Sequence, residues 1–191
     1  CSPLAWAPWR SLLRALHDEL IKMSQNPKDW VMPTGDYANQ RYSKLKQITA
    51  QNVGNLQVAW TFSTGVLRGH EGGPLIIGNV MYVLARNSSL VALDAATGRE
   101  IWIHENLPGL ATRGIAFWES KDRKDRRLIF ALNNYLQEID ATTGKSILTF
   151  GNTGMVDLRQ GLGRDPATIA RIQPEAPGRV FENLIMLGSS V

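Results

Sequence analysis

Short apolar runs fill the chain from Asp29 onward, and glycine, asparagine and aspartate separate them at intervals of about eight to twelve residues. This pattern predicts short strands joined by tight turns, and hence an all-β fold. Between two of the runs, Gly78 and Asn79 predict a two-residue hairpin turn. The expected strands are residues 56–64, 73–78, 80–85, 89–94, 100–104, 114–118, 127–132, 135–140 and 183–188.

The N-terminal residues follow a different pattern. Apolar side chains recur there at helical spacing and predict an amphipathic helix over about Ser11–Met23. Trp6 and Trp9 precede it and fit either a membrane-surface segment or ordinary packing. We therefore expect two parts, an N-terminal helical extension (residues 1–28) and a β domain (residues 29–191). The helical apolar positions are Leu12, Leu13, Leu16, Leu20 and Met23.

One phrase occurs twice, as LVALDAATGREIW (residues 90–102) and LQEIDATTGKSIL (residues 136–148). Its aspartate can accept hydrogen bonds from the turn backbone, and its glycine can adopt the left-handed conformation. A repeat of about 40 to 50 residues with four short strands is typical of a propeller blade. Because an open stack of blades exposes apolar sheet faces, we expect the chain to form part of a closed ring.

Composition and charge exclude several classes of protein. The chain has 191 residues, 43% hydrophobic and 20% charged, as in ordinary globular proteins. No apolar run is long enough to predict a membrane-spanning helix. The densest charged cluster, Lys121–Arg127, mixes two aspartates with five cations and contains no aromatic residue. This favours a solvated hairpin loop over a nucleic-acid-binding patch.

No motif for phosphate or metal binding is present, because the chain has no glycine-rich phosphate loop and its three histidines lack metal-ligand spacing. The single cysteine, Cys1, excludes an internal disulfide. Its position as the first residue fits either a mature lipoprotein or a fragment of a longer reading frame. We favour the fragment, because residues 183–191 are expected to form a strand without a partner.

The repeat resembles the tryptophan-docking repeat of quinoprotein dehydrogenases that use pyrroloquinoline quinone (PQQ). In this resemblance Trp102 is a docking ring, and Gly98 is the residue on which a neighbouring tryptophan stacks. Leu148 stands where the second copy would have tryptophan, and NLQVAW, ending at Trp60, resembles a more degenerate copy. The resemblance implies the first blades of an eight-bladed β-propeller with a short N-terminal helix.

Longer segments extend the resemblance. Residues 29–83 are similar to the N-terminal segment of the PQQ-dependent alcohol, methanol and glucose dehydrogenases. RGIAFW (residues 113–118) and FGNTGMVDLRQGLGRDP (residues 150–166) are closer to the glucose and polyol branch than to the methanol branch.

Three residues match positions at which the family binds PQQ. They are Glu71 in RGHEGGP, Arg113 in TRGIAFW and Ser190 in LGSSV. Arginine suits this role because its planar guanidinium can bind a carboxylate with two hydrogen bonds, and PQQ carries three carboxylates. The alternatives are a polar turn at Glu71, a surface arginine at Arg113 and an ordinary loop serine at Ser190.

The chain also departs from the family pattern. Residues 110–112 stand where the methanol enzymes have adjacent cysteines, and Glu175 or Ala176 stands where the family often has a cofactor-binding threonine. A carboxylate there would repel an anionic cofactor. In the family, the metal ligands and the catalytic aspartate follow the Gly-Ser-Ser segment. The resemblance therefore assigns no catalytic or metal-binding residue to this chain.

The resemblance implies the N-terminal part of a PQQ-dependent dehydrogenase that oxidises an alcohol, polyol or sugar hydroxyl and transfers a hydride to the quinone. Ca²⁺ or another divalent or lanthanide ion would assist, and cytochrome c or a membrane quinone would accept the electrons. We expect a periplasmic location, with membrane association as a further option, and no nucleic-acid partner. The alternative is a non-catalytic propeller of the same repeat family that acts as a protein-binding scaffold lipoprotein.

Overall fold

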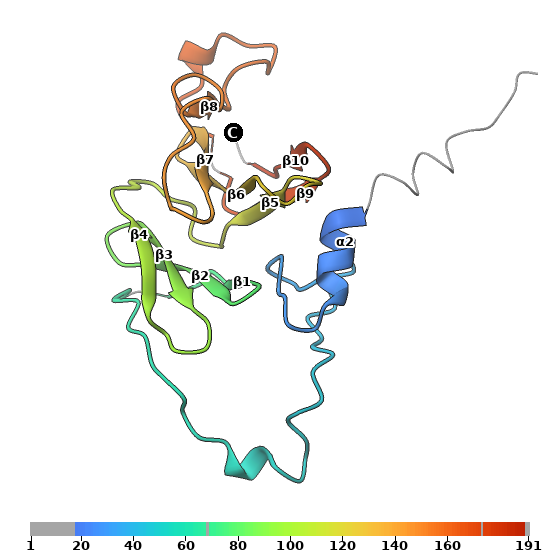
Figure 1. Ribbon diagram of the computed structural model, residues 1–191. Helices are drawn as coiled ribbons and strands as arrows, with labels where there is room; N and C mark the ends of the chain where they lie inside the picture. Colours follow the sequence, from blue (N-terminus) through green and yellow to red (C-terminus); the bar gives the residue numbers. More distant parts are fainter. Residues whose placement is uncertain (1–17, 68, 173, 190–191) are drawn as a thin grey trace, which may run out of the picture.

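The computed structural model describes residues 18–67, 69–172 and 174–189 (Figure 1). Within these residues, the strands and one short α-helix confirm the expected all-β fold with an N-terminal helix. The elements are α2 (Asp18–Gln25), the 3-10 helices η1 (Val53–Asn55) and η2 (Pro166–Thr168), and the strands β1 (Leu75–Ile77), β2 (Val80–Ala85), β3 (Ser89–Asp94), β4 (Glu100–His104), β5 (Ala116–Glu119), β6 (Arg126–Leu132), β7 (Tyr135–Asp140), β8 (Met155–Asp157), β9 (Arg179–Phe181) and β10 (Leu184–Met186).

Each sheet is an antiparallel meander in which every strand pairs with the next. Two sheets have four strands, in the orders β1-β2-β3-β4 and β5-β6-β7-β8, and β9 and β10 form a third, two-stranded sheet. Ile77 pairs with Val80 across the Gly78–Asn79 turn, which confirms the expected hairpin. The expectation that residues 183–191 lack a partner strand was wrong, because β10 pairs with β9.

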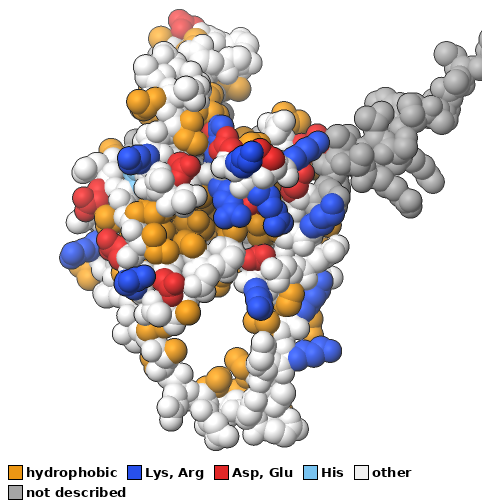
Figure 2. Space-filling model, viewed as in Figure 1, with side chains coloured by type: hydrophobic (Ala, Val, Ile, Leu, Met, Phe, Trp, Pro, Cys, Tyr) orange, Lys and Arg blue, Asp and Glu red, His pale blue; other side chains and the backbone are white. Residues whose placement is uncertain are grey.

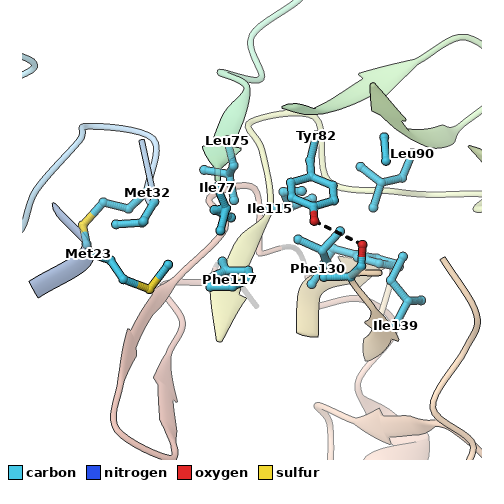
Figure 3. Close-up of a cluster of buried hydrophobic side chains, with 14 of the residues drawn as sticks. Met23, Met32, Leu75, Ile77, Tyr82, Leu90, Ile115, Phe117, Phe130 and Ile139 are labelled. Atoms are coloured by element: carbon cyan, nitrogen blue, oxygen red, sulfur yellow. Dashed lines mark hydrogen bonds between the residues drawn. The ribbon is translucent and has the colours of Figure 1, made fainter. Parts of the chain in front are cut away.

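The two four-stranded sheets pack face to face around one apolar cluster (Figure 3). Tyr82 and Leu90 from one sheet meet Phe117, Phe130 and Ile139 from the other (Figure 3). Burial of large apolar side chains on both sides stabilises the contact between neighbouring sheets. Helix α2 and the segment after it contribute Met23, Val31 and Met32 to the same cluster.

The two repeated turns have the expected geometry. Oδ1 of Asp94 accepts hydrogen bonds from the backbone of Ala96 and Thr97 and from the Thr97 hydroxyl. Asp140 makes the equivalent three bonds in the second turn. Gly98 and Gly144 both have φ of 71°, which a residue with a side chain adopts at a cost.

Each of the two repeated turns is packed against a tryptophan from an earlier segment of the chain. The Nε1–H of Trp102, on β4, donates to the carbonyl of Ala141 at 3.2 Å, and its ring covers Gly144, where an added Cβ would lie 2.6 Å from the ring. Trp60 repeats this arrangement on the Ala95 carbonyl, also at 3.2 Å, and on Gly98. The docking of successive blades is therefore confirmed, and the chain forms part of a propeller.

Three details differ from the expectations. In the part of the chain that the structure describes, residues 56–64 form no strand. They belong to a long loop whose end around η1 lies away from the sheets and which returns to the first sheet at Trp60 and Thr64 (Figure 1). The fourth strand of the second sheet is β8, so Leu148 lies outside it and is 70% exposed. The expected helix continues to Gln25, and residues 11–17 lie outside the described residues.

The charged hairpin between β5 and β6 carries mixed charges, as expected. Figure 2 shows Lys and Arg side chains interspersed with Asp and Glu side chains over this region. The carboxylate of Glu119 is buried and accepts from Arg126 at 2.7 Å, while Arg127 stacks 5.2 Å from the centre of the Trp118 ring. These pairs stabilise the hairpin and neutralise much of its positive charge.

Among the described residues, no helix has the length and apolarity needed to cross a membrane.

Candidate functional site

Glu71, Arg113 and Glu175 lie in corresponding places in three successive sheets. Each occurs within four residues before the first strand of its sheet, β1, β5 or β9. Because the sheets repeat one topology side by side, these loops meet at one end of the assembly. Arg113 Nε donates to Glu71 Oε2 at 2.9 Å, and Arg113 Nη1 lies 3.4 Å from Glu175 Oε2.

The cluster is charged and open to solvent. About half of each of these three side chains is exposed. The hydrogen bond to Glu71 and the negative charge of Glu175 raise the pKa of Arg113 above its usual value. The guanidinium therefore stays positively charged, and its two neighbours give the cluster an excess of negative charge.

Backbone contacts fix the loop that carries Glu71. The side chain of His70 contacts the Leu84 carbonyl through Nε2 at 3.0 Å. At Gly72 an added Cβ would lie 3.0 Å from the carbonyl oxygen of Thr112, so a glycine lets this loop approach the one that carries Arg113. His70 and Glu71 are both exposed and precede β1. Glu71 also does more than form a local turn, since it bonds Arg113 across the sheet boundary.

Among the described residues, Glu71 borders three hollows. One, of about 430 Å³, is mainly apolar and lies against the β2–β3 turn. A second, of about 310 Å³, lies between Glu71, Arg113, Arg171 and Glu175. The third, of about 680 Å³, is lined by Arg41, Arg113 and Arg179 together with Glu71, and we call it the arginine pocket. Arg113 lines the second and the third.

The arginine pocket fits an anionic ligand such as PQQ. Its volume lies in the range of small-molecule sites. Gly73 and Gly188 lie on its wall, and an added Cβ would meet no atom within 4 Å at Gly188 and only a carbonyl at 3.9 Å at Gly73. Ligand atoms can therefore approach the backbone closely at both places. The arginines among its lining residues can donate paired hydrogen bonds to carboxylates.

The structure brings together two of the three predicted cofactor-binding residues, Glu71 and Arg113, and their role toward PQQ stays a prediction. Ser190 lies outside the described residues. Arg41 and Arg179 were missed: Arg41 lies within the family-like segment of residues 29–83, but neither residue was singled out as a candidate for binding. Within the described ranges, no three His, Cys, Asp or Glu residues are grouped so as to hold a metal ion.

Known proteins resemble the chain over most of its length. The family model described as glucose/ethanol/alcohol dehydrogenase, beta-propeller domain (PQQ) matches residues 30–191. The lanthanide-dependent methanol dehydrogenase of Methylorubrum extorquens is 57% identical over 91 residues, which cover 47% of this chain and 15% of the relative. Subunit 1 of the methanol dehydrogenase (cytochrome c) of Paracoccus denitrificans is 33% identical over 190 residues, which cover 91% of this chain and 28% of the relative.

A solved structure supports the same assignment. The quinohemoprotein alcohol dehydrogenase of Comamonas testosteroni matches with a TM-score of 0.68 and 26% identity, over 90% of this chain and 24% of that one. The chain thus spans 15% to 28% of the length of these proteins. Since the family model matches residues 30–191, well over half of the chain, the chain belongs to the PQQ-dependent glucose/ethanol/alcohol dehydrogenase β-propeller family.

Proposed function

We propose that this chain forms the N-terminal part of a PQQ-dependent dehydrogenase that oxidises an alcohol, and that Arg113 anchors a carboxylate of the cofactor. The observation that carries the proposal is the placement of Arg113, which Glu71 holds at 2.9 Å on the rim of the arginine pocket. An arginine that a partner has already oriented loses little freedom on binding a ligand.

The chain's own residues would bind and orient the cofactor. Glu71 engages Nε of Arg113 and so fixes the plane of the guanidinium, which leaves the Nη side toward Glu175 and the pocket. Gly73 and Gly188 keep the wall of the pocket clear. The bound quinone would supply the hydride acceptor for the carbon that bears the substrate hydroxyl, and Ca²⁺ or a lanthanide ion would supply Lewis acidity.

The names of the relatives support a proposal for the substrate and the electron acceptor. These name methanol and alcohol dehydrogenases, one with cytochrome c, and we propose a primary alcohol as substrate and cytochrome c as acceptor. Polyols, sugars and a membrane quinone form a second group to be tested, because residues 113–118 and 150–166 resemble the glucose and polyol branch. A periplasmic location accords with this chemistry.

The test uses the protein encoded by the natural reading frame that contains this chain, prepared without PQQ. We expect PQQ with Ca²⁺ or a lanthanide ion to restore dye reduction with methanol or ethanol as substrate. The rates with glycerol and glucose will show how polyols and sugars compare with these alcohols. Arg113→Ala should weaken PQQ binding by about 10- to 100-fold, the range for hydrogen bonds to a charged group. Arg99→Ala is the matched control, since Arg99 is exposed on the turn after Gly98. Failure of the wild-type protein to bind PQQ would favour the scaffold alternative.

A further inference from the structure

The arginine pocket has an unbalanced charge. Arg41, Arg113 and Arg179 line it, and Glu71 is the one acidic residue among its described lining residues. Glu71 already bonds Arg113. Guanidinium groups gathered in a concave site repel one another and attract anions, so this charge distribution favours an anionic occupant.

The neighbouring hollow shows the contrast. The second hollow is lined by two carboxylates, Glu71 and Glu175, and by two guanidiniums, Arg113 and Arg171. Its charges therefore balance. The first hollow is mainly apolar. Of the three, the arginine pocket alone combines a large volume with excess positive charge.

Arg41 is held in place by backbone geometry. Its φ is 53°, in the left-handed region that an arginine adopts only at a cost, and its N–H donates to the Thr34 carbonyl at 3.1 Å. In the described part of the chain its guanidinium makes no ion pair. The structure therefore fixes the backbone of Arg41 at the edge of the pocket and leaves its charge available.

Arg179 ties the loop of Arg41 to β9. Its Nη2 donates to the hydroxyl of Thr34 at 2.9 Å and also contacts Asn39. The hydroxyl of Tyr37 donates to the Val180 carbonyl at 2.5 Å, which is a second hydrogen-bonded contact between this loop and β9. Nη1 of Arg179 is buried and, in the described part of the chain, has no hydrogen-bond partner.

We propose that Arg41 and Arg113 form two carboxylate subsites of one pocket, that a ligand with two or more carboxylates binds across both, and that Arg179 positions the loop of Arg41. The inference rests on the proposed function, because it names a second contact for the same tricarboxylate cofactor. Two separated arginines distinguish a polycarboxylate from a monocarboxylate, since only the former engages both charges at once.

The experiment measures PQQ binding to the cofactor-free protein of the natural reading frame by titration calorimetry, without reference to turnover. Arg41→Ala should weaken PQQ binding by about 10-fold, the value of one charge-assisted hydrogen bond. Arg41→Lys keeps the positive charge but loses the planar pair of donors of a guanidinium. Its affinity for PQQ should therefore lie between those of Arg41→Ala and the wild type. Arg99→Ala removes an exposed arginine elsewhere and should leave the affinity unchanged.

Two simple probes report on the subsites. Tricarballylate should displace PQQ at a lower concentration than acetate, and Arg41→Ala should reduce that difference. Thr34→Val removes the oxygen that accepts from Arg179, and it should weaken PQQ binding only while Arg41 is present. In a double-mutant cycle, Thr34→Val and Arg41→Ala should therefore have non-additive effects on PQQ binding. Non-additivity would show that Thr34 and Arg179 act through Arg41.

The outcomes separate the two proposals. If Arg113→Ala weakens PQQ binding and Arg41→Ala does not, the second subsite is refuted and the proposed function stands. If neither substitution changes the affinity, both proposals fail. The subsite would also be overturned if Arg41→Ala weakened the binding of tricarballylate and of acetate by the same factor. Only tricarballylate can engage both arginines at once, so it should lose more affinity than acetate.

Discussion

Two regions of the molecule differ in how their polar groups are satisfied. At the face between the two four-stranded sheets, Tyr82 and Trp102 both donate to the carbonyl of Ala141, at 3.1 and 3.2 Å, within the apolar cluster. At the end where β1, β5 and β9 begin, Glu71 and Arg113 are paired but half exposed. Buried, mutually satisfied groups stabilise a fold, whereas exposed charges contribute little to stability. We therefore expect substitutions at the face to change stability and substitutions at the charged end to change ligand binding.

The largest effect expected is that of Trp102→Ala. Loss of the ring removes an aromatic contact with the cluster and exposes the Ala141 carbonyl, at a cost of about 3 to 5 kcal/mol in the free energy of unfolding. Urea denaturation of the natural-frame protein measures it. Trp60→Ala is the comparison, since Trp60 makes the same contacts from a segment without a strand and should cost less. Equal costs would show that strand pairing does not strengthen the docking.

Gly144→Ala tests the partner of that ring. An added Cβ would lie 2.6 Å from Trp102 on a backbone with φ of 71°, so we expect a loss of about 2 to 4 kcal/mol from strain and displaced packing. Gly78→Ala is the matched control, because Gly78 has φ of 61° and open space around it. It should show the backbone cost alone, about 1 kcal/mol. Thermal denaturation of both variants should show the smaller shift for Gly78→Ala, and equal shifts would argue against close packing of Trp102.

The face should also respond to high pH through Tyr82. Burial is the main cause that raises the pKa of this phenol from 10.0 to about 12. The neutral phenol therefore contributes stability that is full below pH 10 and is lost as the pH rises through 12. A shift of this size corresponds to about 2 to 3 kcal/mol. Unfolding followed between pH 9 and 12 measures the loss.

Variants isolate this contribution from other groups that titrate at high pH. Tyr82→Phe should reduce stability at pH 9 and flatten the alkaline loss. Tyr42→Phe, at a tyrosine that is 73% exposed, should leave the alkaline profile as it is. A profile that Tyr82→Phe leaves unaltered would remove Tyr82 from this role.

The sequence predicted the face far better than the charged end, for physical reasons. Asp94, Gly98 and their counterparts in the second repeat act through local hydrogen bonds and backbone conformation, which a short stretch of sequence records. The strands β3, β4 and β7 match their expected ranges, since alternation and turn signals bound them on both sides. Residues 56–64 have the same apolar pattern and yet form no strand, because a strand needs a neighbour that no local pattern supplies.

The charged end depends on contacts between residues far apart in the chain. Arg113 meets Glu71 across 42 positions, and Arg179 meets Thr34 across 145. No periodicity records such pairings. The resemblance indicated Glu71 and Arg113 one at a time, but only the fold shows that they pair and that Glu175 adds a second carboxylate to the same arginine. Arg41 and Arg179 carry no sequence signal of their own and became visible through the pocket they line.

The smallest effect expected is that of Glu175→Gln, and its sign is informative. Glu175 lies 3.4 Å from Arg113 Nη1, on the side of the guanidinium that a cofactor carboxylate would approach. Neutralising it should remove both competition for Arg113 and repulsion of the anion, so PQQ should bind about 2- to 5-fold more tightly. Glu71→Gln should act oppositely, because Glu71 orients the guanidinium through Nε. Calorimetric titration with PQQ measures both variants, and both should unfold at the wild-type temperature. If Glu175→Gln weakened PQQ binding instead, Glu175 would be a second orienting group, and the charged end would be satisfied within itself like the face between the sheets.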